Sequence, residues 1–155
     1  AAQTGHLVLA TLHTNDAPTA ITRLLDIGIA AFLITSTING IIAQRLVRSI
    51  CQECKYERLL TADEMTYLGL EVKDYKVWEG KGCDACRGTG YKGRTGIFEV
   101  LEFTDELKAK ITDRTDMADI YEIAKADGMV SLRELAIQKM LEGHTTFNEI
   151  VSVTG

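Results

Sequence analysis

The 155-residue chain lacks several features that would place it in a class of proteins directly. It contains no G-x4-G-K-[S/T] sequence, which excludes a P-loop phosphate cradle within these residues. Aromatic residues make up only 6 % of the chain and the net charge is −5, so we expect no general affinity for nucleic acid. The remaining composition, 46 % apolar and 25 % charged, is typical of a globular protein.

Targeting and membrane segments are also missing. The first residues show no basic region followed by an apolar run, as a signal peptide would. The longest apolar stretch, residues 24–47, is interrupted by Asp26, Asn39, Gln44 and Arg45, which argues against a membrane span. We therefore expect a cytoplasmic protein with no transmembrane segment, in a reducing compartment.

Cysteines are few, and they form two pairs: Cys51 with Cys54, and Cys83 with Cys86. Two C-x2-C pairs are typical of a tetrahedral zinc site with four thiolate ligands, so these residues predict structural zinc. Two disulfides would require an oxidising compartment, and free or redox-active thiols are a further alternative. Basic residues close to the second pair would offset the negative charge of four thiolates: Lys81, Arg87, Lys92 and Arg94.

Periodicity predicts a strand at residues 6–14 and helices over about 17–27 and 30–48. The segment 6–12 is apolar on both faces, as in a strand inside a sheet that is covered on both sides. The first 50 residues cannot supply such a sheet, so we expect the chain to be the back end of a larger protein. Further strands are expected at Tyr75–Trp78 and Thr95–Leu101, and further helices beginning near Thr104 and near Thr115 or Asp116. Three capping boxes predict the starts of three more helices: Thr61 with Glu64, Ser131 with Glu134, and Thr146 with Glu149.

Several motifs resemble one protein family. Residues 4–15, Thr-Gly-His-Leu-Val-Leu-Ala-Thr-Leu-His-Thr-Asn, are similar to the His box of the secretion ATPase superfamily, which includes the motors of type II secretion and type IV pili. Segments 20–24, 43–48, 90–101 and 141–150 resemble later parts of the family in the same order. In this superfamily the tetracysteine element belongs to the assembly and secretion ATPases, the GspE/PilB group, and is absent from the retraction ATPases.

The resemblance implies an α/β fold: the C-terminal part of a RecA-like P-loop ATPase domain, with a tetracysteine zinc-binding module and a small C-terminal helical bundle. Residues 1–49 would be the distal part of the RecA-like domain, residues 50–96 the zinc module and residues 97–155 the helical subdomain. The family's Walker motifs would lie upstream, so these residues alone are expected to be inactive.

The resemblance also implies a setting. The parent would be a homo-hexamer that uses ATP and Mg²⁺ to drive pilus assembly or type II secretion. It would lie in the cytoplasm and associate peripherally with the inner membrane through a platform protein. The residues do not distinguish pilus assembly from secretion.

Four residues in the first 50 are candidates for the nucleotide site. By resemblance, His13 and His6 would sense the γ-phosphate or position catalytic groups, and His13 is favoured because ligands gather at the carboxyl ends of strands. Arg23 and Arg45 could reach a phosphate or a neighbouring subunit. The alternatives are histidines held by packing and arginines in surface ion pairs.

Other functions are compatible with the cysteines. The main alternative is a non-catalytic, zinc-stabilised protein-interaction module. Residues 83–90 also match one repeat of a DnaJ-type chaperone, but such proteins need four repeats. A nucleic-acid-binding zinc ribbon is disfavoured by the low aromatic content and the acidic helices.

Overall fold

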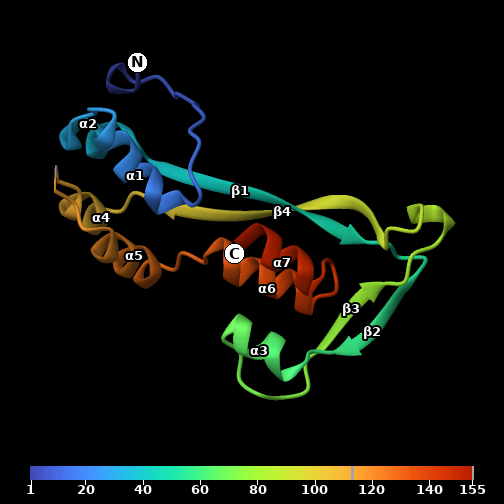
Figure 1. Ribbon diagram of the computed structural model, residues 1–155. Coiled ribbons are helices and arrows are strands. Elements are labelled where there is room, and N and C mark those ends of the chain that lie inside the picture. The colour runs from blue at the N-terminus through green and yellow to red at the C-terminus, as the bar shows by residue number, and fades with distance from the viewer. Residues whose placement is uncertain (113, 155) are drawn as a thin grey trace. The chain divides into compact units, whose positions relative to one another are not determined.

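The computed structural model describes residues 1–112 and 114–154, and these form two compact units. The first unit combines Ala1–Ala43 with Phe98–Ser131, and the second combines Gln44–Ile97 with Leu132–Gly155. Among the described residues, no helix is both long enough and apolar enough to cross a lipid bilayer. Figure 1 labels the elements, which are η1 (Ala2–Thr4), α1 (Ala17–Asp26), α2 (Ala31–Thr37), β1 (Gly40–Ile50), β2 (Lys55–Leu59), α3 (Ala62–Leu68), β3 (Lys76–Gly80), η2 (Asp84–Cys86), β4 (Tyr91–Glu102), α4 (Asp105–Lys110), α5 (Met117–Ala126), α6 (Leu132–Leu141) and α7 (Phe147–Thr154).

Helices α1, α2, α4 and α5 enclose the core of the first unit. Helix α1 begins where predicted, because the Asp16 carboxylate accepts a hydrogen bond from Thr19 N at 2.8 Å and Pro18 occupies its first turn. The carboxylate of Glu99 on β4 also reaches this end of the helix and accepts a hydrogen bond from Ala17 N at 2.7 Å. The fully or nearly fully buried core side chains of this unit include Ile21, Ile34, Leu101, Leu107 and Ile120.

The second unit is built on the antiparallel pair β2–β3. Lys55 lies opposite Gly80 and Leu59 opposite Lys76 in this register. Helix α6 packs against β3 and also against α7. The sequence predicted β3 and the helices α3, α6 and α7 but not β2, which follows the first cysteine pair directly.

The expected helix over residues 30–48 is wrong in its second half. Helix α2 ends at Thr37, and Gly40–Ile50 forms strand β1, which pairs with β4. The apolar residues of this stretch fit both periods, but Ile41, Ile42, Val47 and Ile50 are β-branched and favour a pleated strand. Pairing with β4 therefore decides the conformation of residues 40–50.

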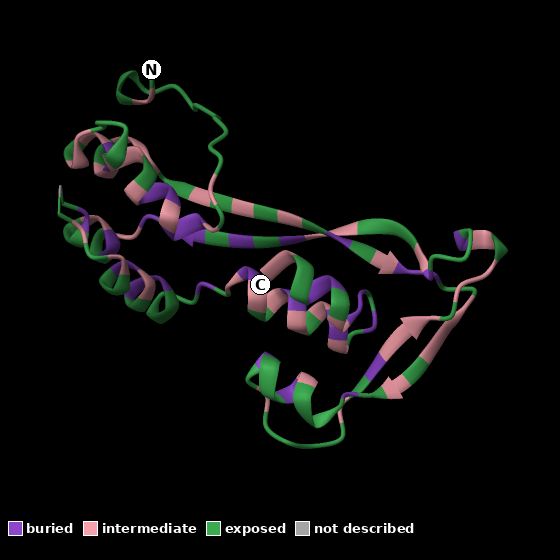
Figure 2. Ribbon diagram, viewed as in Figure 1, coloured by how far each residue is buried: buried purple, intermediate pink, exposed green. Residues whose placement is uncertain are grey.

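The strand expected at residues 6–14 is also not formed. Among the described residues, this segment has no regular secondary structure, and Leu7 and Leu9 are 84 % and 88 % exposed (Figure 2). A strand requires a neighbouring strand to bond its backbone N–H and C=O groups. The apolar pattern identified a segment suited to burial, but this structure does not bury it.

Candidate metal centre

The four cysteines converge in the second unit. Cys51 follows β1, Cys54 precedes β2, Cys83 precedes η2 and Cys86 ends it. Their Sγ atoms all lie within 4.8 Å of one another, and the described cysteines form no disulfide. The predicted convergence of the two pairs is therefore confirmed.

The spacing of the sulfurs fits a tetrahedral ion. The Sγ–Sγ distances are 3.8 Å for Cys51–Cys83, 3.9 Å for Cys54–Cys86 and 3.8 Å for Cys83–Cys86. Four sulfurs that each lie about 2.3 Å from a tetrahedrally coordinated zinc ion are separated by about 3.8 Å. A disulfide would require a distance of about 2.0 Å. The three distances thus match those of tetrahedral zinc, and all four sulfurs lie close enough together to share one ion.

Backbone N–H groups point at one of the sulfurs. Cys83 N donates to the Sγ atom of Cys86 at 3.1 Å, and Gly90 N donates to the same atom at 3.2 Å. Such N–H donors are a typical outer shell of a metal-bound thiolate, because they stabilise its negative charge. They require close backbone approach: a Cβ atom on Gly80 would lie only 2.7 Å from Gly90 Cα.

The surroundings shift the pKa values of two of the thiols in opposite directions. Removal from water raises the pKa of Cys54 to about 12. Desolvation also raises the pKa of Cys86, but the N–H donors of Cys83 and Gly90 outweigh it and bring the pKa to about 6. A metal ion that binds all four sulfurs must therefore displace at least the Cys54 proton.

The expected basic surroundings are present in part. Lys92 forms an exposed ion pair with Glu53 at 3.2 Å. This hydrogen bond raises the pKa of Lys92, and the negative charge of the Cys51 and Cys83 sulfurs contributes to the same shift. Lys92 is thus one cation that responds to the charge of the cluster.

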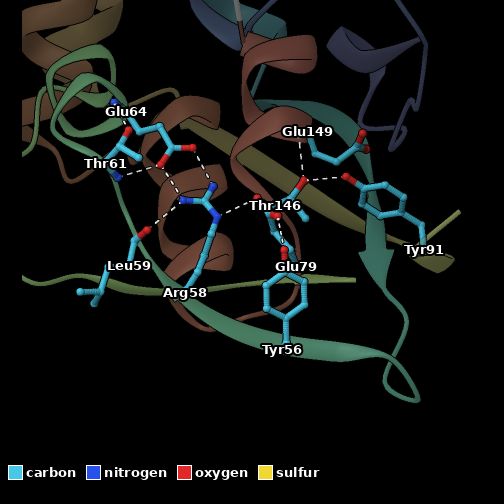
Figure 3. A network of polar contacts seen from close by, with 9 residues as sticks. All are labelled: Tyr56, Arg58, Leu59, Thr61, Glu64, Glu79, Tyr91, Thr146 and Glu149. Carbon is cyan, nitrogen blue, oxygen red and sulfur yellow. Dashed lines mark hydrogen bonds and ion pairs between the residues drawn. The ribbon is translucent and has the colours of Figure 1, made fainter. Parts of the chain in front are cut away.

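A polar network stabilises the β2–β3 pair beside the cysteines (Figure 3). The Arg58 guanidinium donates to both Glu64 oxygens at 2.7 and 2.6 Å and to Glu79 at 2.7 Å. Tyr56 donates to the other Glu79 oxygen at 2.9 Å. The capping box of α3, Thr61 with Glu64, is formed as the sequence predicted, and one Glu64 carboxylate serves both the cap and Arg58.

A second network lies at the start of α7. Glu149 is 5 % exposed, and its carboxylate accepts hydrogen bonds from the backbone N and the guanidinium of Arg48. The sequence signal, Thr146-x-x-Glu149, predicted an ordinary capping box. Glu149 N does lie 3.4 Å from the Thr146 hydroxyl, but the carboxylate binds Arg48, 101 positions earlier. Sequence reasoning therefore missed the role of Glu149.

The candidate nucleotide residues are placed as follows. His6 and His13 lie in the exposed segment without regular structure, and Arg23 lies on the exposed side of α1, all in the first unit. Arg45 lies on β1 in the second unit and is half-buried. That these four residues act together at a nucleotide site stays a prediction.

Comparison with known proteins supports the resemblance. The model of the family described as type II/IV secretion system protein matches residues 1–152. The chain belongs to this family. It is 45 % identical over 99 % of its length to the type IV pilus assembly ATPase PilB of Thermus thermophilus. It is 43 % identical to the type II secretion system protein HxcR of Pseudomonas aeruginosa and 41 % identical to the type II secretion system protein E of Aeromonas hydrophila, each over 99 % of its length.

The relatives are much longer than the 155-residue chain. It spans 18 % of the Thermus protein, 29 % of the Pseudomonas protein and 31 % of the Aeromonas protein. The predicted membership in the GspE/PilB group is confirmed. Relatives from pilus assembly and from secretion match almost equally well, so identity does not separate the two.

Proposed function

We propose that this chain is the C-terminal part of an ATPase that powers type IV pilus assembly or type II protein secretion. The observation that carries the proposal is the match over 99 % of the chain to proteins named for these processes. The converged cysteines support the same assignment, because this element marks the assembly and secretion branch of the superfamily. No P-loop occurs among the 155 residues, so the phosphate cradle and the Mg²⁺ ligand belong to other residues of the full-length protein.

In this proposal the full-length protein is a cytoplasmic homo-hexamer. ATP hydrolysis changes the packing of its subunits, and the motion passes to a platform protein in the inner membrane. His13 and His6 position groups around the γ-phosphate, and Arg23 and Arg45 contact a phosphate or the neighbouring subunit. The exposure of the segment 6–14 leaves its histidines accessible to such partners.

The histidine assignment is tested in the full-length protein. His13→Ala is expected to lower the ATP turnover rate on the order of 100-fold, the loss typical of removing one preorganised transition-state contact. Nucleotide affinity should be largely retained, since phosphate binding depends on other residues. His144→Ala is the matched control, because His144 is an exposed histidine of the second unit that pairs with Glu142 at 3.4 Å. Unchanged turnover in His13→Ala would remove this residue from the reaction.

We further propose that the ion held by the four cysteines is zinc and that its role is structural. Four thiolates fill the coordination sphere and leave no open position for substrate. Elemental analysis should find about one zinc per chain. Cys51→Ser should lose the zinc and unfold residues 50–96, because structural zinc contributes on the order of 10 kcal/mol. A protein that is metal-free with reduced cysteines, yet fully folded, would refute the structural role.

A further inference from the structure

The turn between α6 and α7 contacts the chain on both sides of the cysteine pairs. We define the Gly143–Glu149 segment as this turn together with the start of α7. It lies 57 or more positions after Cys86, the last cysteine, so no local sequence rule connects the two. Its contacts involve the residues just before Cys51, just after Cys54, and just after Gly90.

The first contact is made by the end of β1. Ile50 N donates to His144 O at 3.0 Å, and the Thr145 hydroxyl donates to Arg48 O at 2.8 Å. Cys51 follows Ile50 directly, so these bonds fix the position from which the first ligand enters the cluster. Cys51 N in turn donates to Gly90 O at 2.9 Å, which joins the approach to the first pair with the exit from the second.

The second contact is made by Glu149. Its Oε2 accepts a hydrogen bond from Arg48 N at 2.7 Å, and its Oε1 accepts from Arg48 Nε at 2.8 Å and from the terminal guanidinium nitrogen at 2.6 Å. Both carboxylate oxygens are used by one residue. A nearly buried carboxylate that accepts three hydrogen bonds is a strong and directional attachment.

The third contact follows the second cysteine pair. The Tyr91 hydroxyl lies 2.8 Å from the Thr146 hydroxyl, and the Arg48 guanidinium stacks 4.0 Å above the Tyr91 ring. Figure 3 shows Tyr91, Thr146 and Glu149 joined in this way. Tyr91 is preceded by Gly90, whose N–H points at Cys86 Sγ.

The fourth contact follows the first pair. Lys55, the residue after Cys54, donates through Nζ to Gly143 O at 2.7 Å. The same ammonium lies 5.1 Å from the centre of the Trp78 ring on β3. The ammonium therefore binds a carbonyl just after α6 and contacts Trp78, so it connects β2 and β3 to the end of this helix.

We propose that the Gly143–Glu149 segment holds the two cysteine pairs at metal-binding distance, and that Glu149 and Thr145 are the positioning residues. Metal occupancy and the docking of this segment are then coupled, and the coupling acts in both directions. Docking slows the loss of the ion, and the ion stabilises the docked segment. The proposal rests on the metal assignment above and not on the ATPase assignment.

The forward test measures the rate at which the zinc-loaded full-length protein releases zinc to a chromophoric chelator. Glu149→Gln should release it about tenfold faster or more, the effect typical of lost outer-shell support. Glutamine keeps the size of the side chain but supplies one acceptor oxygen where the structure uses two. Thr145→Val should also accelerate release, whereas Thr145→Ser, which keeps the hydroxyl, should restore the normal rate.

Glu142→Gln is the matched control. It makes the same change of charge one position before the segment. The Glu142 carboxylate pairs with the half-buried Lys139 at 3.1 Å and with the exposed His144 at 3.4 Å. Its zinc release should match that of the unaltered protein. Equal acceleration by Glu142→Gln, or no acceleration by Glu149→Gln and Thr145→Val, would overturn the proposal.

The reverse test measures amide hydrogen exchange before and after zinc is removed. Exchange should accelerate in residues 144–150 and stay unchanged in α5, which belongs to the first unit. A general loss of stability would accelerate both, and would show that the effect is not specific to the segment. If the unaltered protein binds no zinc, both the metal assignment and this coupling fail, whereas normal ATP turnover would leave the ATPase assignment intact.

Discussion

Arg58 is the residue that joins most groups within the β2–β3 region. Its guanidinium contacts the side chains of Glu64 and Glu79 and donates to Leu59 O at 2.9 Å. The planar fork of an arginine can serve two carboxylates at once, which a lysine ammonium does less well. Because Glu64 also caps α3, this one guanidinium links the strand pair to the helix.

The ion pair of Arg58 with Glu64 predicts a pH-dependent stability. The hydrogen bond from Arg58 holds the pKa of Glu64 below its usual value. A carboxyl group whose folded-state pKa is lowered stabilises the fold above its unfolded pKa, and this stabilisation is lost as pH falls through the folded-state pKa. Glu64→Gln should therefore lower the free energy of unfolding at pH 7 by about 1–2 kcal/mol.

The difference between Glu64→Gln and the unaltered protein should shrink as pH falls below the usual pKa of a glutamate and towards the lowered pKa of Glu64, as measured by urea unfolding at several pH values. Glu57→Gln is the control, because Glu57 pairs with Lys76 at 3.0 Å on an exposed surface of the same strands. Such pairs contribute little. A difference for Glu64→Gln that is constant with pH would contradict the role of the ion pair.

At the scale of elements, the end of α6 depends on a residue without a side chain. Gly143 has a φ of +76°, and a Cβ atom there would lie 2.7 Å from Lys55 Nζ and 2.8 Å from Trp78 Cε3. The turn is therefore constrained twice, by its backbone conformation and by the side chains that pack over it. The second constraint arises only because β2 and β3 lie against this end of the helix.

Gly143→Ala should consequently destabilise the second unit by more than backbone strain alone. Gly69→Ala is a matched control, because Gly69 ends α3 in the same unit with a φ of +71°, and a Cβ atom there would meet no other atom within 4 Å. The control should lose about 1–2 kcal/mol from the left-handed conformation. Urea unfolding should show a clearly larger loss for Gly143→Ala, and equal losses would mean that Lys55 and Trp78 move aside without cost.

Element types were predictable where local signals agreed. Helices α1, α3, α4 and α5 begin at the expected capping residues, and β3 and β4 overlap the expected strands. Residues 40–50 were not predictable, because their apolar positions suit a helix or a strand and the partner strand β4 lies about 50 positions later. The sequence also did not reveal that Glu149 binds Arg48, because the two residues are 101 positions apart.

At the scale of the whole molecule, the two units are interleaved along the chain. Each unit takes one segment from residues 1–97 and one from the residues that follow. Such an arrangement makes many contacts between distant residues, so each unit needs both of its segments to fold. The segment 6–14 differs from the rest of the first unit, because its leucines are exposed and do not pack into the core.

The segment 6–14 gives a prediction that depends on the length of the protein. In the 155-residue chain, Leu9→Gln should leave stability unchanged, since Leu9 is 88 % exposed. In the full-length protein, the expected interior strand would bury Leu9, and Leu9→Gln should cost about 1.5–3 kcal/mol. Leu59→Gln, at an exposed position of β2, is the control for both lengths. Urea unfolding that shows no loss in the full-length protein would mean that the segment stays exposed.

The sequence by itself determined the two C-x2-C pairs that could hold a metal, the family and most helix starts, because each depends on residues close together in the chain. The C-x2-C spacing, the capping residues and the family motifs are all local patterns. The tertiary structure alone decided that residues 40–50 form a strand, that the four sulfurs lie within 4.8 Å of one another, and that Glu149 and Gly143 contact the chain beside the cysteines. Those features join groups that are about 30 to 100 positions apart in the sequence, and only folding brings such groups into contact.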